Sequence, residues 1–205
     1  IETGLFRNDI PLSEKKITAE VCVHHLWFSS ADYKTHGTRI KWNPAVKHQE
    51  DQDALWTALN DDRIDVLATD HAPHTLEEKN NKYASAPSGG PLVQHALLAL
   101  LTASKRGKIS LEKLVQKACH NPAILFDVEK RGYIRVGYFA DLVLLDLNET
   151  TTVTPESLLY HCKWSPFEGE TFQAKIESTW VNGSCVYDKG VIIENKAAKR
   201  LTFNR

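Results

Sequence analysis

Apolar and polar residues repeat with two different periods along this chain. In the first part, residues 53–59 carry apolar side chains at helical spacing, and the short apolar run 65–69 that follows is compatible with a buried strand. A helix that leads into a buried strand is half of an α/β repeat. From residue 132 onward the runs become short and strand-like, with turn signals such as residues 181–183 between them, which indicates part of a β-sandwich.

Two more helices are expected in the first part. Residues 92–101 are apolar on most sides, which indicates a buried helix that ends near residues 105–107. Ser110 can cap residues 111–115, and this helix is expected to run to a break at Asn121–Pro122. The strands expected later in the chain span residues 133–136, 141–146, 176–181 and 185–187.

The most informative segment is Ala68-Thr69-Asp70-His71-Ala72-Pro73-His74, which places an aspartate where an apolar strand ends and a polar loop begins. In α/β barrels the active site lies at the carboxyl ends of the strands. Asp70 would therefore lie at that mouth, with His71 and His74 just beyond it, and such groups suit metal binding and proton transfer. The alternative is a solvated loop in which Asp70 only caps the next turn.

Asp70-His71-Ala72-Pro73-His74, with Lys79 following, resembles a sequence signature of the dihydroorotases, which belong to the amidohydrolase superfamily. The resemblance covers nearly the whole chain, because further segments match in the family's order. These segments are Glu20–Leu26, Ile40–Pro44, Ala86–Gly89, Asn121–Ala123 and Gly137–Val143.

This resemblance implies a metal-dependent hydrolase that interconverts L-dihydroorotate and N-carbamoyl-L-aspartate in de novo pyrimidine biosynthesis. It implies an α/β fold in which residues 1–131 form the C-terminal part of a (β/α)8 TIM-like barrel. Residues 132–205 would form a portion of a small β-sandwich domain and the C-terminal tail. The implied cofactor is Zn²⁺, with two ions in the complete active site and most of their ligands outside this chain.

Five residues carry the family's site roles in this resemblance. Asp70 matches the aspartate that ends the eighth barrel strand, binds one metal and acts as general base toward the attacking water. Asn43 and His74 match substrate-binding positions, and Ser88 and Gly89 fall in the loop that holds the substrate through its backbone. The chemistry has its own physical basis, because water is a poor nucleophile until a metal lowers its pKa. The alternative for Asn43 is a turn residue before Pro44, and the alternative for His74 is a surface-loop histidine.

His24 and His25 are tempting additional metal ligands because they end an apolar stretch. Adjacent residues on a strand point to opposite faces, so the two rings cannot both face one metal without a bulge. In the family's pattern this position supplies no metal ligand. We therefore expect the pair to pack beside the site or to support it.

The length of the chain predicts an incomplete enzyme. A (β/α)8 barrel alone needs about 250 residues, whereas this chain has 205 residues, begins at Ile1 and contains no methionine. The family's His-x-His pair, its bridging lysine or aspartate and two further histidine ligands have no match in it. We expect the 205-residue chain to be inactive by itself.

Composition and charge exclude few classes but favour a small-molecule substrate. With 42% hydrophobic residues and a formal net charge of -1, the chain resembles an ordinary globular protein without a strongly charged partner. The basic run 196–200 lacks interleaved aromatic residues, which argues against nucleic acid, and no run is long enough to span a membrane. The spacing of the four cysteines indicates free thiols in a reducing, cytoplasmic compartment. The oligomeric state stays open, a homo-oligomer included.

Two alternatives to a dihydroorotase stay open. A hydantoinase or allantoinase would share the architecture and the metal chemistry, although the Asp70–His74 motif together with Asn43 favours dihydroorotase. A noncatalytic dihydroorotase-like homologue would keep the barrel for binding or assembly. Loss of the His-x-His pair from the whole protein would support this last hypothesis.

Overall fold

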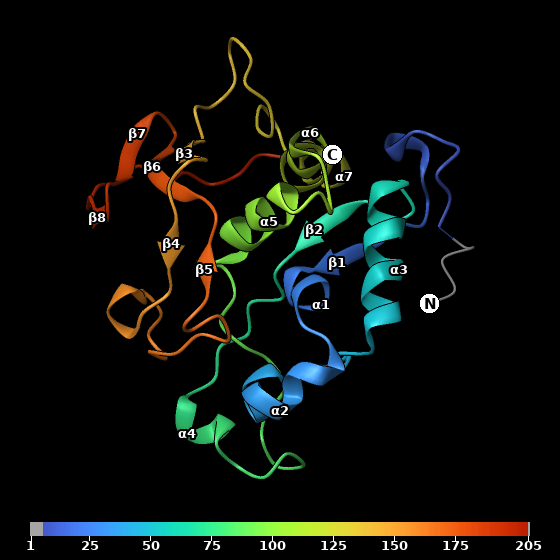
Figure 1. Cartoon of the computed structure of the whole chain (residues 1–205). Coiled ribbons are helices and arrows are strands. Elements are labelled where there is room, and N and C mark those ends of the chain that lie inside the picture. The colour runs from blue at the N-terminus through green and yellow to red at the C-terminus, as the bar shows by residue number, and fades with distance from the viewer. Residues whose placement is uncertain (1–5, 205) are drawn as a thin grey trace.

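Two short parallel strands, β1 (Glu20–Cys22) and β2 (Val66–Ala68), lie side by side in the computed structural model, which describes residues 6–204 (Figure 1). Val21 pairs with Leu67 in this parallel register. Because parallel strands end at the same edge of a sheet, the segments that follow β1 and β2 start next to each other. This arrangement places the loop that begins at Asp70 beside the chain that follows β1.

The helices of the described chain include α1, which contacts both α3 and α5. Their bounds are α1 Val23–Trp27, α2 Tyr33–His36, α3 Gln49–Asn60, α4 Leu76–Lys79, α5 Ala96–Lys105, α6 Leu111–Val115 and α7 Asn121–Leu125. The helix expected over residues 53–59 is confirmed as α3, which buries Trp56 and Leu59. The cap on α6 is confirmed too, since the Ser110 hydroxyl accepts a hydrogen bond from the Lys113 amide.

The break expected at Asn121–Pro122 is wrong, because the helix continues through it. Residues Gln116–His120 form a π-helical turn, and α7 runs on directly from Asn121. Pro122 lies in the first turn of α7, directly after the π-helical turn, in which the Asn121 amide donates to the Gln116 carbonyl five residues back. A proline can therefore stand in a continuous helical path when a π-helical turn precedes it.

The predicted start of the buried helix is also wrong, because α5 begins at Ala96 and not at Leu92. The Leu92 amide donates a 3.0 Å hydrogen bond to His71 Nδ1, and the Gln94 amide donates a 2.9 Å bond to the Tyr160 hydroxyl. These long-range acceptors hold residues 92–95 in a turn. The helix that follows is buried as expected.

The C-terminal part contains a four-stranded antiparallel sheet in the order β3-β6-β7-β8 (Figure 1). Its strands are β3 Leu142–Asp146, β6 Lys175–Val181, β7 Ser184–Asp188 and β8 Val191–Ile192. Asn182 and Gly183 adopt positive φ angles of 50° and 82°, as a tight hairpin between β6 and β7 requires. The expected strands over residues 141–146, 176–181 and 185–187 are confirmed.

The strand expected over residues 133–136 is wrong, since these residues form a loop. Ile134 is 89% exposed, so the apolar run has no sheet face or core to cover it among the described residues. Tyr133 instead packs edge-on against His120, with ring centroids 4.2 Å apart. A short apolar run becomes a strand only where another strand is available to pair with it.

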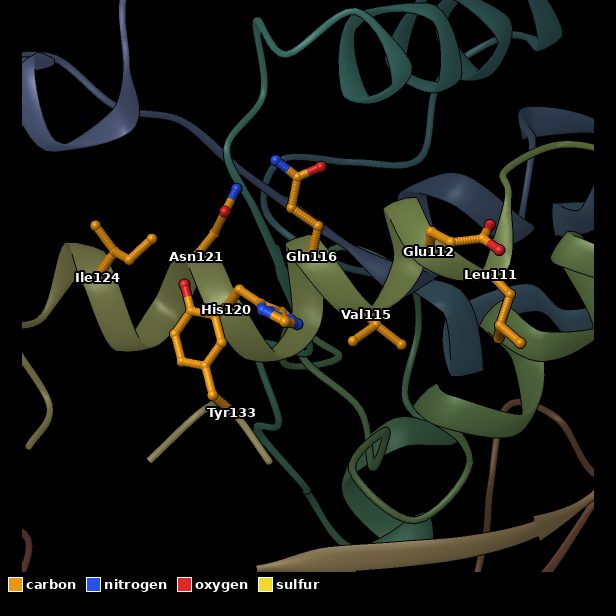
Figure 2. Close-up of a pocket in the computed structure, with 8 residues that line it drawn as sticks. All are labelled: Leu111, Glu112, Val115, Gln116, His120, Asn121, Ile124 and Tyr133. Atoms are coloured by element: carbon orange, nitrogen blue, oxygen red, sulfur yellow. The ribbon is translucent and has the colours of Figure 1, made fainter. Parts of the chain in front are cut away.

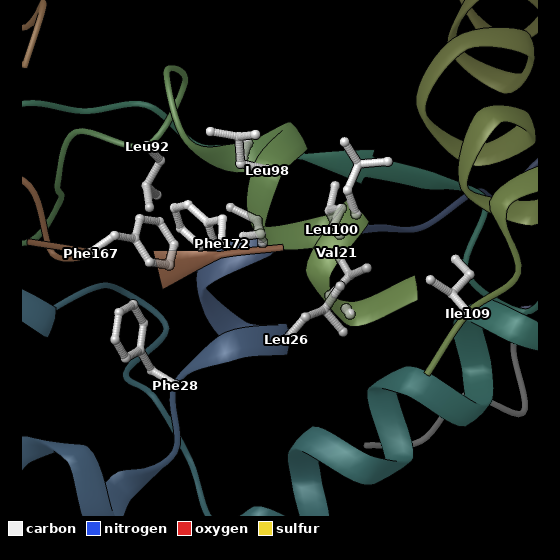
Figure 3. Close-up of a cluster of buried hydrophobic side chains, with 14 of the residues drawn as sticks. Val21, Leu26, Phe28, Leu92, Leu98, Leu100, Ile109, Phe167 and Phe172 are labelled. Atoms are coloured by element: carbon white, nitrogen blue, oxygen red, sulfur yellow. The ribbon is translucent and has the colours of Figure 1, made fainter. Parts of the chain in front are cut away.

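The hydrophobic core joins residues from both parts of the chain (Figure 3). Between β3 and β6 the chain forms a two-stranded sheet of β4 (Thr151–Thr152) and β5 (Thr171–Phe172). Phe167 and Phe172 from this segment are fully buried and lie among core residues such as Phe28 and Leu92. Residues 147–174 thus pack on the α/β part, and the boundary at residue 132 stays a prediction.

Two further expectations concern the whole described chain. All four cysteines carry free thiols, as expected: Cys22, Cys119, Cys162 and Cys185. Within residues 6–204, none of the helices has the length and apolar character needed to cross a membrane.

Candidate functional site

Four segments meet beyond the carboxyl ends of β1 and β2. We call them the four-loop site, and they are residues 22–25, 41–44, 70–74 and 88–90. The Gly89 amide donates a 3.0 Å hydrogen bond to the Lys41 carbonyl, and the Ala72 amide donates a 3.2 Å bond to the Gly90 carbonyl. The structure therefore brings together the segments that hold all five residues predicted for the site.

Asp70 turns the chain out of β2 and into this site. It adopts a φ of 47°, a left-handed conformation that aspartate tolerates better than most residues. Its side chain is exposed, and no group within residues 6–204 donates a hydrogen bond to its carboxylate. Asp70 therefore caps no turn through its carboxylate in this part of the chain, and the carboxylate is open to solvent or to a ligand.

The negative charge of Asp70 acts on two neighbours that follow β1. Burial, followed by the charges of Glu20 and Asp70, raises the pKa of the Cys22 thiol to about 12. Burial lowers the pKa of His25, while its hydrogen bond to Pro44 and the charge of Asp70 oppose that shift. Asp70 thus faces the end of β1 and the start of α1, and Cys22 stays a neutral thiol.

His74 connects two segments of the site. Its Nε2 atom lies 3.1 Å from the Ser88 carbonyl, and its Nδ1 atom lies 3.7 Å from a Glu78 carboxylate oxygen. Glu78 is itself fixed by a capping box with Thr75 at the start of α4. The helix start therefore holds a carboxylate beside the imidazole, while the imidazole contacts the loop predicted to bind the substrate.

Gly89 can occupy its place only without a side chain. It has a φ of 123°, and a Cβ atom there would lie 2.6 Å from the Ala72 carbonyl oxygen and 3.3 Å from His74 Cδ2. An L-residue would be strained in its backbone and would clash with residues 72–74. The loop with Ser88 and Gly89 consequently lies directly against the Asp70 loop, with the Ser88 side chain exposed.

Asn43 is exposed at the edge of the site. It follows the buried Trp42, and its peptide bond to Pro44 is cis. In the part of the chain that the structure describes, no hydrogen bond engages the Asn43 side chain. Its amide group can therefore bind a ligand that enters the four-loop site.

His24 and His25 lie on α1 and not on a strand, so the argument from opposite strand faces does not apply. The two rings still have different surroundings. His24 is 1% exposed and stacks on Trp42 with ring centroids 4.3 Å apart, whereas His25 Nε2 lies 3.0 Å from the Pro44 carbonyl. His24 thus takes the packing role that the sequence predicts.

Burial gives His24 a strong pH dependence. Its ring nitrogens are buried, and burial lowers its pKa from 6.5 to about 3, although a backbone contact with Thr69 opposes the shift. The neutral ring fits the fold, while the unfolded chain takes up a proton below about pH 6.5. Acidification through this window therefore favours unfolding.

We expect the free energy of unfolding to fall as the pH drops from about 6.5 toward 4, and we expect His24→Phe to reduce this slope. One proton taken up on unfolding corresponds to about 1.4 kcal/mol per pH unit. Urea unfolding at several pH values measures the slope. His95, whose pKa burial lowers to about 4, provides a residual dependence in the variant. An unchanged slope in His24→Phe would contradict the assignment.

Hollows on the surface add residues that the sequence argument missed. One hollow beside the Asp70 loop is lined by His71 and His74 on one side and by Leu159, Tyr160 and His161 on the other. Tyr160 stacks near His71, with ring centroids 5.5 Å apart. No sequence signal marks this pairing, because the two residues come from distant loops.

A second hollow runs along α6, the π-helical turn and α7 (Figure 2). Figure 2 shows apolar side chains such as Val115 and Ile124 lining it, with His120 beside Tyr133. Glu112 is the one carboxylate in its lining. Glu112 and His120 come from opposite ends of this hollow and the family's Asp70–His74 motif lies elsewhere, so the chemistry is assigned to the four-loop site.

The described residues supply only part of a metal site. Within residues 6–204, no group of three or more histidine, cysteine, aspartate or glutamate side chains is placed to hold a metal ion. Asp70, whose carboxylate accepts no hydrogen bond from these residues, fits the role of one ligand. A complete zinc site needs three or four donors, which is more than this part of the chain brings together.

Parallel strands with a free carboxylate and histidines in the loops at their carboxyl ends define an α/β protein with an enzyme-like site. The chain belongs to the amidohydrolase family, whose model matches residues 10–186. The similarity to this family therefore extends from the Asp70–His74 motif over most of the chain.

Two relatives show which members of the family the chain resembles in sequence and in structure. The chain is 42% identical over 173 residues to a dihydroorotase of Halobacterium salinarum, a match that covers 83% of this chain and 40% of that protein. Its structure resembles an L-hydantoinase (dihydropyrimidinase) from Arthrobacter aurescens, with a TM-score of 0.80, 32% identity, and coverage of 86% of this chain and 40% of the other. The chain thus spans about two fifths of the length of these relatives.

A third similarity concerns a protein described as inactive. The inactive dihydroorotase-like domain of a CAD-like multifunctional protein from Chaetomium thermophilum has a TM-score of 0.65 and 25% identity, covering 89% of this chain and 47% of the other. The same fold therefore occurs with and without activity among the relatives, so the site decides between them.

Proposed function

We propose that the whole protein is a dihydroorotase, a metal-dependent hydrolase that interconverts L-dihydroorotate and N-carbamoyl-L-aspartate. One observation carries the proposal: the free carboxylate of Asp70 lies at the end of β2, beside a loop that His74 and Gly89 hold in place. The 42% identity to the Halobacterium salinarum dihydroorotase supports this substrate.

The finer architecture is part of the same proposal. In it, β1 and β2 are the last two strands of a (β/α)8 barrel, residues 1–131 are its C-terminal part, and residues 132–205 belong to a β-sandwich domain with a tail. The parallel pairing of β1 and β2 and the antiparallel sheet of β3, β6, β7 and β8 support it. We place the protein in the cytoplasm, which agrees with its free thiols.

Asp70 has two roles in this proposal, as a metal ligand and as the general base. When bound, Zn²⁺ would lower the pKa of water and polarise the carbonyl of the cyclic amide. The Asp70 carboxylate would take the proton of the attacking water during ring opening and return a proton in the reverse direction. Its exposure and its lack of a competing hydrogen bond within the described chain support both roles.

Substrate binding is assigned to the other predicted site residues. Asn43 would offer its side-chain amide, and His74 would help to hold the substrate carboxylate through its imidazole. Ser88 and Gly89 would contribute backbone groups from a loop that is fixed against residues 72–74. The exposed side chains of Asn43 and Ser88 lie on segments that meet at the same site, which supports a shared ligand.

His74→Ala in the whole protein is expected to raise the Michaelis constant for L-dihydroorotate about tenfold, because it removes a hydrogen bond to the substrate. Steady-state kinetics measures the change. His120→Ala is the control, since His120 is a half-buried histidine outside the four-loop site. An unchanged Michaelis constant with full turnover in His74→Ala would contradict the substrate role.

The competing proposal is a different cyclic amidase, one that acts on hydantoin or allantoin. The structural similarity to the Arthrobacter aurescens L-hydantoinase is the reason to test it. Parallel assays of the whole protein with L-dihydroorotate, hydantoin and allantoin separate the two. We expect ring opening of L-dihydroorotate at the highest kcat/KM. Preference for hydantoin or allantoin would assign the protein to a sister amidase, and no turnover of any would favour a noncatalytic homologue.

A further inference from the structure

Lys79 is a buried ammonium group that pairs with no carboxylate in the described chain. It ends α4 and has 0% exposure, which is rare for a lysine. Its Nζ atom donates three hydrogen bonds, to the carbonyls of Gly89 at 2.8 Å, Pro87 at 2.9 Å and Lys41 at 3.2 Å. An ammonium group has three donors, so all of them are used on backbone oxygens.

Lys41 engages the same loop from the other side. Its Nζ atom donates to the carbonyls of Tyr83 and Ala86, each over 2.6 Å. Together the two lysines bind four of the seven carbonyl groups of residues 83–89, and a fifth, that of Ser88, contacts His74. We call residues 83–89 the carbonyl loop.

Trp164 covers Lys79 and shields it from water. The Lys79 Nζ atom lies 5.9 Å from the centre of the Trp164 ring, and Trp164 is fully buried. The indole Nε1 atom donates a 2.8 Å hydrogen bond to the His74 carbonyl, which joins this cover to the Asp70 loop. Hydrogen bonds of a charged donor are stronger where water is excluded, so the loop conformation is well determined.

We propose that Lys79 and Lys41 are positioning residues that fix the substrate-binding backbone of Ser88 and Gly89 by binding the carbonyl loop. This inference rests on the proposed function, because it concerns the same substrate site. The Lys79 ammonium has no donor left for the substrate, and the Lys41 ammonium is held by two carbonyls of the loop. Their effect on catalysis passes through the loop.

The charge of Lys79 is also sensitive to pH. Burial, followed by the positive charge of Lys41, lowers the pKa of Lys79 to about 8. Lys41 is the charged group that faces it from a neighbouring segment, and the ring of Trp164 covers the other side without charge. Deprotonation removes one donor and the charge, so the hold on the carbonyl loop weakens in alkaline solution.

Lys79→Met tests the proposal in the whole protein, because methionine keeps an unbranched apolar stem and removes the ammonium group. We expect the Michaelis constant for L-dihydroorotate to rise about tenfold with kcat changed less than threefold. Hydrogen–deuterium exchange of residues 83–90 is expected to become faster. In the wild type the Michaelis constant is expected to rise above pH 8, and this rise is absent in the variant.

Two variants make the test specific. Lys82→Met changes an exposed lysine three residues away and is expected to leave both readouts unchanged. Lys41→Met removes the hydrogen bonds to Tyr83 and Ala86 alone and is expected to act in the same direction as Lys79→Met, which keeps the test valid if the latter does not fold.

The outcomes distinguish failure of the positioning role from failure of the proposed function. An active wild type with unchanged Michaelis constants in Lys79→Met and Lys41→Met overturns the positioning role alone, as does faster exchange without a kinetic change. A wild type that opens no L-dihydroorotate overturns the proposed function, and the positioning role falls with it.

Discussion

Asp70→Asn in the whole protein is expected to lower kcat for L-dihydroorotate by at least about a thousandfold and to leave the fold intact. General base catalysis alone contributes about 10²–10⁴ in rate, and the change also weakens a metal ligand. The fold is spared because the carboxylate is exposed and forms no hydrogen bond with the described residues. Steady-state kinetics and thermal unfolding measure the two effects.

Asp127→Asn is the matched control for this substitution. Asp127 is also exposed and also adopts a left-handed conformation, with a φ of 53°, but it follows α7 and lies outside the four-loop site. The same chemical change at the same backbone conformation is expected to leave kcat within about twofold. Near-normal turnover in Asp70→Asn would disprove the assignment of the base.

Asp65→Ala is expected to destabilise the protein by about 3–5 kcal/mol, the usual cost of removing one partner from a buried ion pair. The Lys15 ammonium lies 2.6 Å from one Asp65 oxygen, and their side chains are 4% and 3% exposed. The other oxygen accepts a 3.0 Å hydrogen bond from the Ala19 amide. Asp65 therefore ties the start of β2 to the residue before β1.

The comparison is with Asp9→Ala, which breaks an exposed ion pair. Arg7 and Asp9 form a 2.7 Å pair with side-chain exposures of 60% and 64%. Such a pair adds little to stability, since solvent screens it. Urea unfolding measures both variants, and a loss in Asp65→Ala no larger than that in Asp9→Ala would show that the buried pair adds nothing to stability.

Local patterns predicted the elements whose residues determine their own conformation. The apolar spacing before Asn60 gives α3, and the short run before Asp70 gives β2, so the aspartate at the strand end was found correctly. The loops between them were harder. The start of α5 depends on His71 and Tyr160, which bind amides from distant positions, and no local pattern reports such acceptors.

In the site, too, local sequence predicts which residues are present but not the contacts that distant segments make with them. The residues named from the family's pattern lie on segments that meet, although their roles stay predictions. The sequence predicts His24 and His25 at the end of a strand, which is wrong: β1 ends at Cys22, and both residues lie on α1. The environment of Lys79 could not be predicted either, since it consists of backbone carbonyls from loops that meet only in the folded chain.

The most direct test is ring opening of L-dihydroorotate by the whole protein, measured before metal removal with a chelator, after it, and again after Zn²⁺ is restored. We expect turnover that is lost with the metal and recovered with zinc, and we expect zinc-loaded Asp70→Asn to stay at least about a thousandfold slower. A zinc-loaded wild-type protein that leaves L-dihydroorotate unchanged would contradict the account.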